Sequence, residues 1–233
     1  GALQWVFGAL LFALFVTFNR WVGENAITTT AYLNNDYTCW PYFLDCGKYY
    51  FLTALPQGYS QTMFYSALFA LMLLIVYLMY KRDWVLAHIG LFSLFIWKAL
   101  VVLVLTYSAT GNYDYYDIVF LFIFLFLPHK LFFLRVGFVS LYFLASTIKF
   151  DGGWILGTYF TSLATGLPIF GNAIAPLATN FVIFMQVVGS WFLLSANKLL
   201  QRLALAYFVF FHLYSSILVQ YRYLATALPI LII

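Results

Sequence analysis

Charge is what this 233-residue chain has least of: only 8% of its residues are charged, whereas 65% are hydrophobic and 23% are aromatic. A soluble domain carries about 25% charged residues, so the composition excludes a soluble globular protein. The few charges stand singly between apolar runs, which excludes a disordered chain and a nucleic-acid-binding surface. The composition predicts an all-α integral membrane protein.

The sequence also lacks the motifs of the commonest catalytic and cofactor sites. It has no Walker loop, no Rossmann glycine set, no HExxH, no GxSxG and no cysteine-rich metal motif. Phosphate cradling, zinc chemistry and serine hydrolysis therefore have no basis in the sequence, and we expect no bound metal. We expect no haem either, because His88, His129 and His212 fall at different depths of the predicted spans.

Apolar runs long enough to cross a bilayer recur along the chain. About 20 helical residues cross the roughly 30 Å hydrocarbon layer, and charged residues, glycine and proline separate runs of this kind. We predict a polytopic helical bundle of seven to eight spans. The predicted spans are 2–19, 62–80, 84–107, 114–128, 131–148, 176–196 and 203–220, with a further apolar stretch at 223–233. The chain opens at Gly1 and stops at Ile233 within that stretch, as a fragment of a longer chain would.

Basic residues favour one side of this topology. Alternating the seven spans places six Lys or Arg and one Asp on one side, against four Lys or Arg and six Asp or Glu on the other. The basic side should be cytoplasmic, which predicts a cytoplasmic amino terminus. We expect a bacterial inner membrane, with an ER-type membrane as the alternative. The basic residues of this side are Lys81, Arg82, Lys130, Arg135, Lys198 and Arg202.

Two connections are too long to be simple turns, and the topology places both outside the cytoplasm. The long first loop, 20–61, holds the only two cysteines, Cys39 and Cys46. An oxidising compartment permits a disulfide between them, and two reduced thiols are the alternative. The second connection, 150–175, is apolar but interrupted by glycines and a proline, so we predict an interfacial or re-entrant segment rather than a span.

A lysine lies unusually deep in a predicted span. Lys98 is fourteen residues into the third span, about 21 Å along a helix, so it cannot fully reach either surface. An intramembrane cation is costly and needs a partner inside the bundle. We predict an ion pair with Asp117, with Asp114 as a second candidate; a ligand or a proton path is the alternative role.

Two other polar side chains sit at or within predicted spans. Lys149 ends the fifth span in the run STIKFDGGW. It could anchor the helix at the membrane surface beside Trp154, or act as a base if burial lowers its pKa. His212 lies near the middle of the last full span, where a hydrogen-bonded core histidine is the plain interpretation.

The run YFLASTIKFDGGWILG, residues 142–157, resembles the segment of vitamin K-dependent gamma-carboxylases in which an apolar helix ends in a lysine, followed by an acidic turn and a Trp. The run AYFVFFHLYSSILVQYRYLATALPI, residues 206–230, is similar to that family's late span. The chain thus resembles the horizontally transferred transmembrane (HTTM) family over most of its length. The resemblance implies a single HTTM-like transmembrane domain over 1–233, with a quinone- or lipid-sized cavity under the outer leaflet.

The resemblance also implies roles for individual residues. Lys149 falls where the carboxylases keep the lysine thought to deprotonate vitamin K hydroquinone, Asp151 would tune that lysine, and His212 matches the late-span histidine. The residues expected to line a ligand cavity are Lys98, Tyr113, Asp117 and Trp154. Tyr113, however, stands where the carboxylases place a histidine, and the chain ends before their large lumenal domain. Glutamate carboxylation is therefore not implied.

Three functions remain as hypotheses. We favour a small membrane subunit that packs against partner membrane proteins and holds a lipid or quinone. The alternative is a quinol-dependent membrane enzyme with Lys149 as base. A proton-coupled transporter, with a path through Lys98, Asp114, Asp117 and His212, comes third because the chain has no inverted repeat. The expected partners are the lipid bilayer and other membrane proteins, and not nucleic acid.

Overall fold

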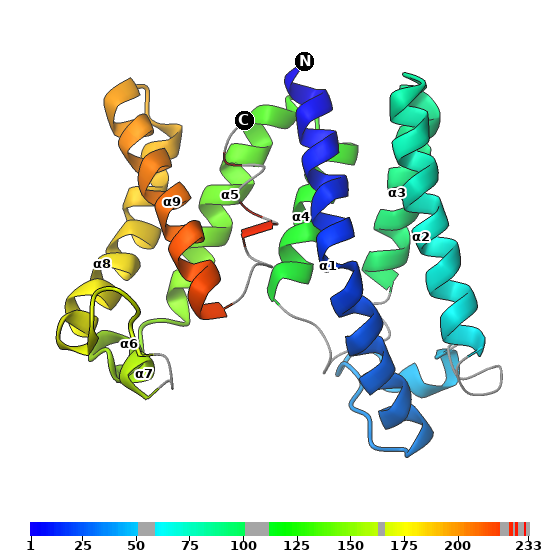
Figure 1. Ribbon diagram of the computed structural model, residues 1–233, viewed down its shortest axis with the longest axis horizontal. Helices are drawn as coiled ribbons and strands as arrows, with labels where there is room; N and C mark the ends of the chain where they lie inside the picture. The colour runs from blue at the N-terminus through cyan, green and yellow to red at the C-terminus, as the bar shows by residue number, and fades with distance from the viewer. Residues whose placement is uncertain are drawn as a thin grey trace. The chain divides into compact units, whose positions relative to one another are not determined.

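The chain is all-helical wherever its structure is described (Figure 1). A computed structural model describes residues 1–50, 59–100, 112–162, 166–219, 224, 225, 227 and 231, without the side chains of residues 20, 24, 25, 28, 112, 113 and 219. Twelve helical segments lie in these ranges. They form two compact units: an amino-terminal unit of residues 7–126, and a carboxy-terminal unit of residues 1–6 and 127–233.

In the amino-terminal unit, α2 (Tyr59–Tyr80) and α3 (Trp84–Leu100) form a helical hairpin. The charged turn between them stops α2, because Arg82 adopts a left-handed conformation with φ 61°. Asp83 then starts α3 by accepting a hydrogen bond from the Leu86 amide at 3.2 Å. The two helices approach closely at Gly90, where a Cβ atom would lie 2.6 Å from Ile75 Cγ1.

Aromatic side chains join α1 (Ala2–Leu33), α3 and α4 (Asn112–Phe126). The ring of the fully buried Phe7 lies 5.0 Å from that of His88 and 5.8 Å from that of Phe124. His88 is near the start of α3 whereas Phe124 is near the end of α4, so these two helices run antiparallel. That arrangement places the end of α3, with Lys98, beside the start of α4, with Asp117.

The first helix is longer than predicted. The expected span 2–19 is its apolar part, but the α-helix continues to Leu33, so the first loop begins at Asn34 and not at residue 20. Residues 20–33 contain no proline, and polar side chains do not stop a helix when nothing breaks its backbone hydrogen bonds. The helix ends just before Asn35, whose φ of 55° is left-handed.

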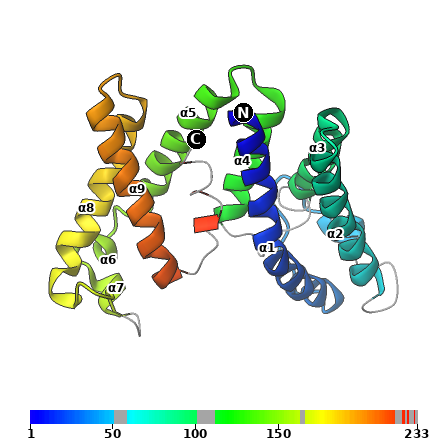
Figure 2. The ribbon, with the colours of Figure 1, turned by 45° about the horizontal axis from the view of Figure 1, so that its top comes forward.

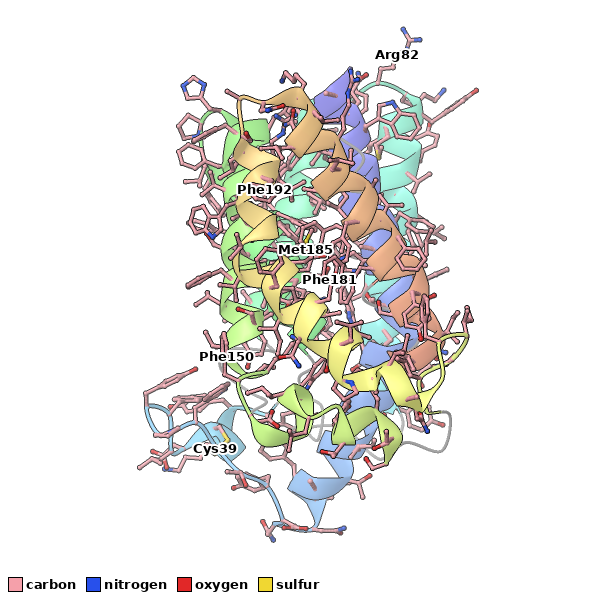
Figure 3. All side chains as sticks on the ribbon, turned by 90° about the vertical axis from the view of Figure 1, so that its left-hand side faces the viewer. Cys39, Arg82, Phe150, Phe181, Met185 and Phe192 are labelled. Atoms are coloured by element: carbon pink, nitrogen blue, oxygen red, sulfur yellow. A yellow bond between two sulfur atoms is a disulfide. The ribbon has the colours of Figure 1, made fainter. Side chains whose placement is uncertain are left out.

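The outer loop is held by the predicted disulfide and by stacked tyrosines. Cys39 and Cys46 are bonded, with their Cα atoms 5.7 Å apart, which confirms the prediction; Figure 3 shows this bridge beside the Cys39 label. Cys46 belongs to the short helix η1 (Cys46–Tyr49). The Tyr32 ring at the end of α1 stacks on Tyr50, with ring centres 3.9 Å apart. The loop is therefore pinned against its own helix.

The carboxy-terminal unit is built on α5 (Lys130–Thr147), α8 (Ala175–Val187) and α9 (Lys198–Val219). Figures 1 and 2 show α5 and α9 beginning at the same end of this unit. Phe138 and Phe208 are in ring contact, and so are Tyr142 and His212 four residues further along each helix. The constant offset of seventy residues means that α5 and α9 run parallel.

Short helices, and not a membrane span, lie between α5 and α8. They are α6 (Gly152–Ile155), α7 (Thr158–Thr161) and η4 (Asn172–Ile174). Gly157 is required at the turn between α6 and α7, because its φ is 71° and a Cβ atom there would lie 2.6 Å from the Pro176 nitrogen. No described part of 150–175 is long enough to cross a membrane, as the sequence predicted.

The predicted span 176–196 is not one continuous α-helix. α8 ends at Val187, and the chain continues as the 3₁₀ helix η5 (Gly189–Leu194). Gly189 weakens the α-helix, and the Ser190 hydroxyl donates to the Gln186 carbonyl at 2.8 Å, in competition with the backbone ladder.

Three described helices are long and apolar enough to cross a membrane. They are Ala2–Asn19 within α1, Tyr59–Tyr80 and Lys130–Thr147. Trp84–Leu100 and Asn172–Val187 are apolar but shorter. The structure thus shows a helical protein with several candidate membrane spans.

Candidate functional site

Three charged side chains meet inside the amino-terminal unit. Lys98 Nζ lies 2.6 Å from Asp117 Oδ2 and 3.0 Å from Asp114 Oδ1. Each of the three side chains is at most 4% exposed. Asp114 and Asp117 are three residues apart in α4 and therefore share one face of that helix. The predicted ion pair of Lys98 with Asp117 is confirmed, and Asp114 completes a buried ion cluster.

An aromatic ring covers the ammonium of this cluster. Lys98 Nζ lies 4.2 Å from the centre of the Trp21 ring, and Trp21 is 3% exposed. The Trp97 ring packs on Trp21 at 5.2 Å. A desolvated cation over the face of Trp gains about 2 kcal/mol. The ion cluster thus ties α1, α3 and α4 together.

Sequence reasoning missed the role of Trp21. A tryptophan near the end of an apolar run is typical of a membrane-interface belt, and nothing local links Trp21 to a lysine that follows far along the chain.

Tyr113 is also a predicted ligand-binding residue. It belongs to the first turn of α4, but its side chain lies outside the described part of the structure.

Lys149 and Trp154 lie together just beyond the end of α5. Lys149 Nζ donates a hydrogen bond to the Ala145 carbonyl at 2.7 Å and lies 5.2 Å from the centre of the Trp154 ring. A lysine on the last carbonyls of a helix also interacts favourably with the helix dipole. Burial lowers the pKa of Lys149 from 10.5 to about 8.

Asp151 starts the next helix. Its Oδ1 accepts hydrogen bonds from the amides of Gly153 at 2.7 Å and Trp154 at 3.1 Å, which makes it the N-cap of α6. The ion pairs found among the described residues do not join Asp151 to Lys149. The carboxylate therefore fixes the turn that presents Trp154 to the lysine.

His212 is a buried, hydrogen-bonded histidine of α9. Its Nε2 is hydrogen-bonded to the Tyr142 hydroxyl of α5, and its side chain is 5% exposed. Within the described ranges, His212 Nδ1 has no hydrogen-bond partner. The hydrogen bonds of His212 do not connect it to Lys149 or Asp151, so no direct bond assembles these three predicted catalytic residues.

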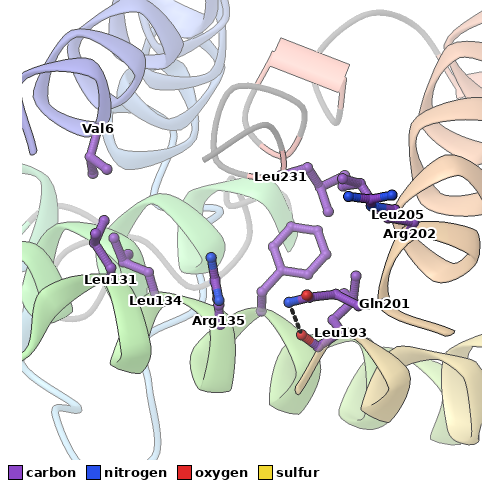
Figure 4. A pocket seen from close by; sticks show the side chains of 10 residues that line it. Val6, Leu131, Leu134, Arg135, Leu193, Gln201, Arg202, Leu205 and Leu231 are labelled. Carbon is purple, nitrogen blue, oxygen red and sulfur yellow. Dashed lines mark hydrogen bonds between the residues drawn. The ribbon is translucent and has the colours of Figure 1, made fainter. Parts of the chain in front are cut away.

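A pocket lies where α5 and α9 begin (Figure 4). Its volume is about 210 Å³. Leucine and phenylalanine side chains form most of its lining, and its polar groups are Arg135 of α5 with Gln201 and Arg202 of α9. From the sequence, the two arginines indicate only the orientation of the chain, because arginines at the cytoplasmic ends of spans are common in membrane proteins.

The described residues contain no cluster of three or more His, Cys, Asp or Glu side chains that could hold a metal ion.

Comparisons of the chain with protein-family models, with curated proteins and with solved structures gave no match. The resemblance to the HTTM family therefore stays a prediction.

Proposed function

We propose that this chain is an HTTM-type, multi-pass membrane protein that serves as a small membrane subunit, packing against partner membrane proteins and holding a lipid or quinone. The proposal includes seven to eight spans, a cytoplasmic amino terminus and a bacterial inner membrane, with an ER-type membrane as the alternative. It also places 150–175 at the membrane interface, which is supported by the exposed apolar side chains of Leu156, next to α6, and Ile169, in a turn, which are 65% and 83% exposed.

The observation that carries the proposal is an aromatic surface on α8 and η5. We call it the α8 face, and it consists of Phe181, Phe184, Met185, Val188 and Trp191. Their spacing places them along one side of the helix, and Figure 3 shows Phe181 and Met185 on the side of α8 turned to the viewer. Phe181, Phe184 and Trp191 are each about half exposed. Aromatic residues and Met are enriched in protein interfaces.

The polar groups near the spans support a structural role. The Lys98 ammonium is bound by two carboxylates, the Asp151 carboxylate caps a helix, and Lys149 binds a backbone carbonyl. Each of these groups has a contact that stabilises the fold without a substrate. A membrane subunit requires nothing more of them.

One observation favours the enzyme as a second candidate. With a pKa lowered to about 8, a substantial fraction of Lys149 is neutral at mildly alkaline pH, and a neutral lysine can accept a proton from a quinol. The transporter stays third, since the ion cluster has titratable groups but the chain has no repeat symmetry.

Site-specific crosslinking tests the proposal. Because the two natural cysteines are bonded to each other, a single new cysteine can carry a photocrosslinker. Val188→Cys probes the α8 face, where Val188 is 40% exposed, and Ile183→Cys, at a position 7% exposed, is the matched control on the same helix.

We expect Val188→Cys to give one crosslinked protein species of defined mass in native membranes, and Ile183→Cys to give none. Native mass spectrometry of the gently extracted protein should then show the same partner in fixed stoichiometry. Crosslinks from Val188→Cys to lipid alone, together with a monomer in the native spectrum, would refute the assembly function.

A further inference from the structure

The pocket between α5 and α9 has positive charge without a matching negative charge in its own unit. From residue 127 to residue 233 the sequence has six Lys or Arg residues but a single acidic residue, Asp151. Asp151 lies beyond the opposite end of α5 from the pocket and caps α6. Arg135 and Arg202 form no hydrogen bond or ion pair with any described residue.

The two arginines lie at nearly the same level of the unit. α5 and α9 run parallel with an offset of seventy residues, so Arg135 is level with Leu205. Arg202 is three residues nearer the start of α9, which is about 4.5 Å along the helix axis. Figure 4 shows Arg135 and Arg202 on opposite sides of the pocket, with Gln201 near Arg202.

Both helices begin at this pocket. The amide groups of a helix's first turn have no partner within the helix, and the helix dipole is positive there. At the start of α9, Asn197 caps part of this turn by accepting from the Leu199 amide at 2.9 Å. The helix ends thus add to the potential of the two guanidinium groups, and the pocket favours an anion with several acceptor oxygens.

The apolar part of the lining indicates what the anion is attached to. The pocket is smaller than the roughly 300–1,000 Å³ that encloses a drug-sized ligand, so it fits a head group rather than a whole amphiphile. Leu131, Leu134 and Leu205 line it beside the arginines. Leu199 and Leu203, on the same turns of α9, are 65% and 58% exposed and offer apolar surface outside it.

We infer that this pocket binds the head group of an anionic glycerophospholipid. Arg135 and Arg202 hold the phosphodiester from two sides, and the acyl chains lie along the exposed leucines of α9. The predicted topology places both arginines on the cytoplasmic side, where basic pockets between helices bind anionic head groups. The inference rests on the proposed function in taking the chain to be inserted in a membrane and to hold a lipid; it does not depend on a protein partner.

Lipid titration followed by native mass spectrometry tests the inference. The full chain, delipidated in detergent, is titrated with phosphatidylglycerol, with phosphatidylcholine of the same acyl chains, and with inorganic phosphate. The variants are Arg135→Gln, Arg202→Gln and the double variant. Arg82→Gln is the matched control, because Arg82 is also exposed and lies on the same predicted side but belongs to the α2–α3 turn. Melting curves check that each variant is folded. If the double variant does not fold, the two single variants are enough to test the inference.

We expect phosphatidylglycerol to bind more tightly than phosphatidylcholine. Each glutamine should weaken phosphatidylglycerol binding about tenfold or more, because a charge-assisted hydrogen bond to the phosphate is lost. Arg82→Gln should bind like the wild type. Equal binding of the two lipids, or equal loss in Arg82→Gln, would overturn the inference. Inorganic phosphate binding as tightly as phosphatidylglycerol would assign the pocket to a soluble anion instead.

The outcome is separate from that of the proposed function. If Val188→Cys still crosslinks to its partner while the arginine variants bind lipid normally, only the lipid site is wrong. If the crosslink is absent but phosphatidylglycerol binding follows the arginines, only the assembly function is wrong. If the arginine variants lose a protein partner and not the lipid, an acidic surface of that partner occupies the pocket and the lipid inference fails.

Discussion

Replacement of Lys98 by methionine should strongly destabilise the amino-terminal unit. Met keeps most of the side-chain volume but removes the ammonium from between two carboxylates that both bind it within 3.0 Å. Asp114 and Asp117 would then be buried close together without their shared cation. Removal of one partner from a buried ion pair costs about 3–5 kcal/mol, a large share of the roughly 5–15 kcal/mol that stabilises a folded protein.

A second lysine of the same chain provides the control. Lys48 Nζ and Asp45 Oδ1 are also 3.0 Å apart, but the two side chains are 72% and 67% exposed. Water and salt screen such a pair, so Lys48→Met should leave the stability unchanged within error. The two substitutions are chemically identical and each removes a 3.0 Å ammonium–carboxylate contact, but Lys98 is buried and also binds a second carboxylate, whereas Lys48 is exposed.

Thermal unfolding in detergent, followed by circular dichroism, measures the difference. For a chain of this size a loss of 1 kcal/mol lowers Tm by about 2–4 °C, so a loss of about 3–5 kcal/mol should make Lys98→Met melt roughly 6–20 °C below the wild type. Asp117→Asn should cost less, because Lys98 keeps Asp114. Equal melting of Lys98→Met and Lys48→Met would refute the argument that the ion cluster holds three helices together.

Three further predictions concern the loop and the end of α5. The pKa of Lys149 is lowered to about 8, so the folded state binds fewer protons than the unfolded state between about pH 8 and 10.5. The wild type should therefore gain stability relative to Lys149→Gln as pH rises through this window. Melting curves of the two proteins, recorded in parallel at several pH values, measure this gain. Asp151→Ala should lower the free energy of unfolding by about 1 kcal/mol, whereas Asp151→Asn, which still caps α6, should lower it little. If Asp151 tunes Lys149, Asp151→Asn should also shift the titration of Lys149, followed by NMR of the protein with methylated lysines. Replacement of Cys39 and Cys46 by serine should destabilise the protein by about 2–3 kcal/mol, because the short disulfide loop no longer restricts the unfolded chain. Chemical unfolding measures this loss. An unchanged stability would mean that the tyrosine stack alone orders the loop.

The features that sequence reasoning predicted are those that depend on depth or on short separations. Lys98 was too deep in its span to reach water, so its pairing with Asp117 followed from the cost of an unpaired cation. The Cys39–Cys46 disulfide closes over a separation of seven residues and needed only an oxidising side of the membrane. Neither prediction required knowledge of how distant helices pack.

Features that depend on how distant helices pack could not be predicted from the sequence. Trp21 covers the Lys98 ammonium only because α1 extends past its apolar part and packs on α3. Hydropathy marks where a helix is apolar and not where it ends, which is why the first helix was predicted too short. The pocket at Arg135 and Arg202 arises from the parallel packing of α5 and α9, and two arginines in separate stretches of sequence do not predict that packing.

The two units differ in whether they contain acidic residues that can neutralise their cations. In the amino-terminal unit, Asp114 and Asp117 neutralise a buried cation within the protein. Beyond residue 126 the sequence offers only Asp151, whose Oδ1 is bound to two backbone amides, and Arg135 and Arg202 form no ion pair with any described residue. A cation near apolar surface is stabilised only if an anion or water reaches it, and at the membrane surface the most abundant anion is the lipid head group. We therefore expect anionic lipid to stabilise this unit, and the stability of the protein in detergent should rise when anionic lipid is restored.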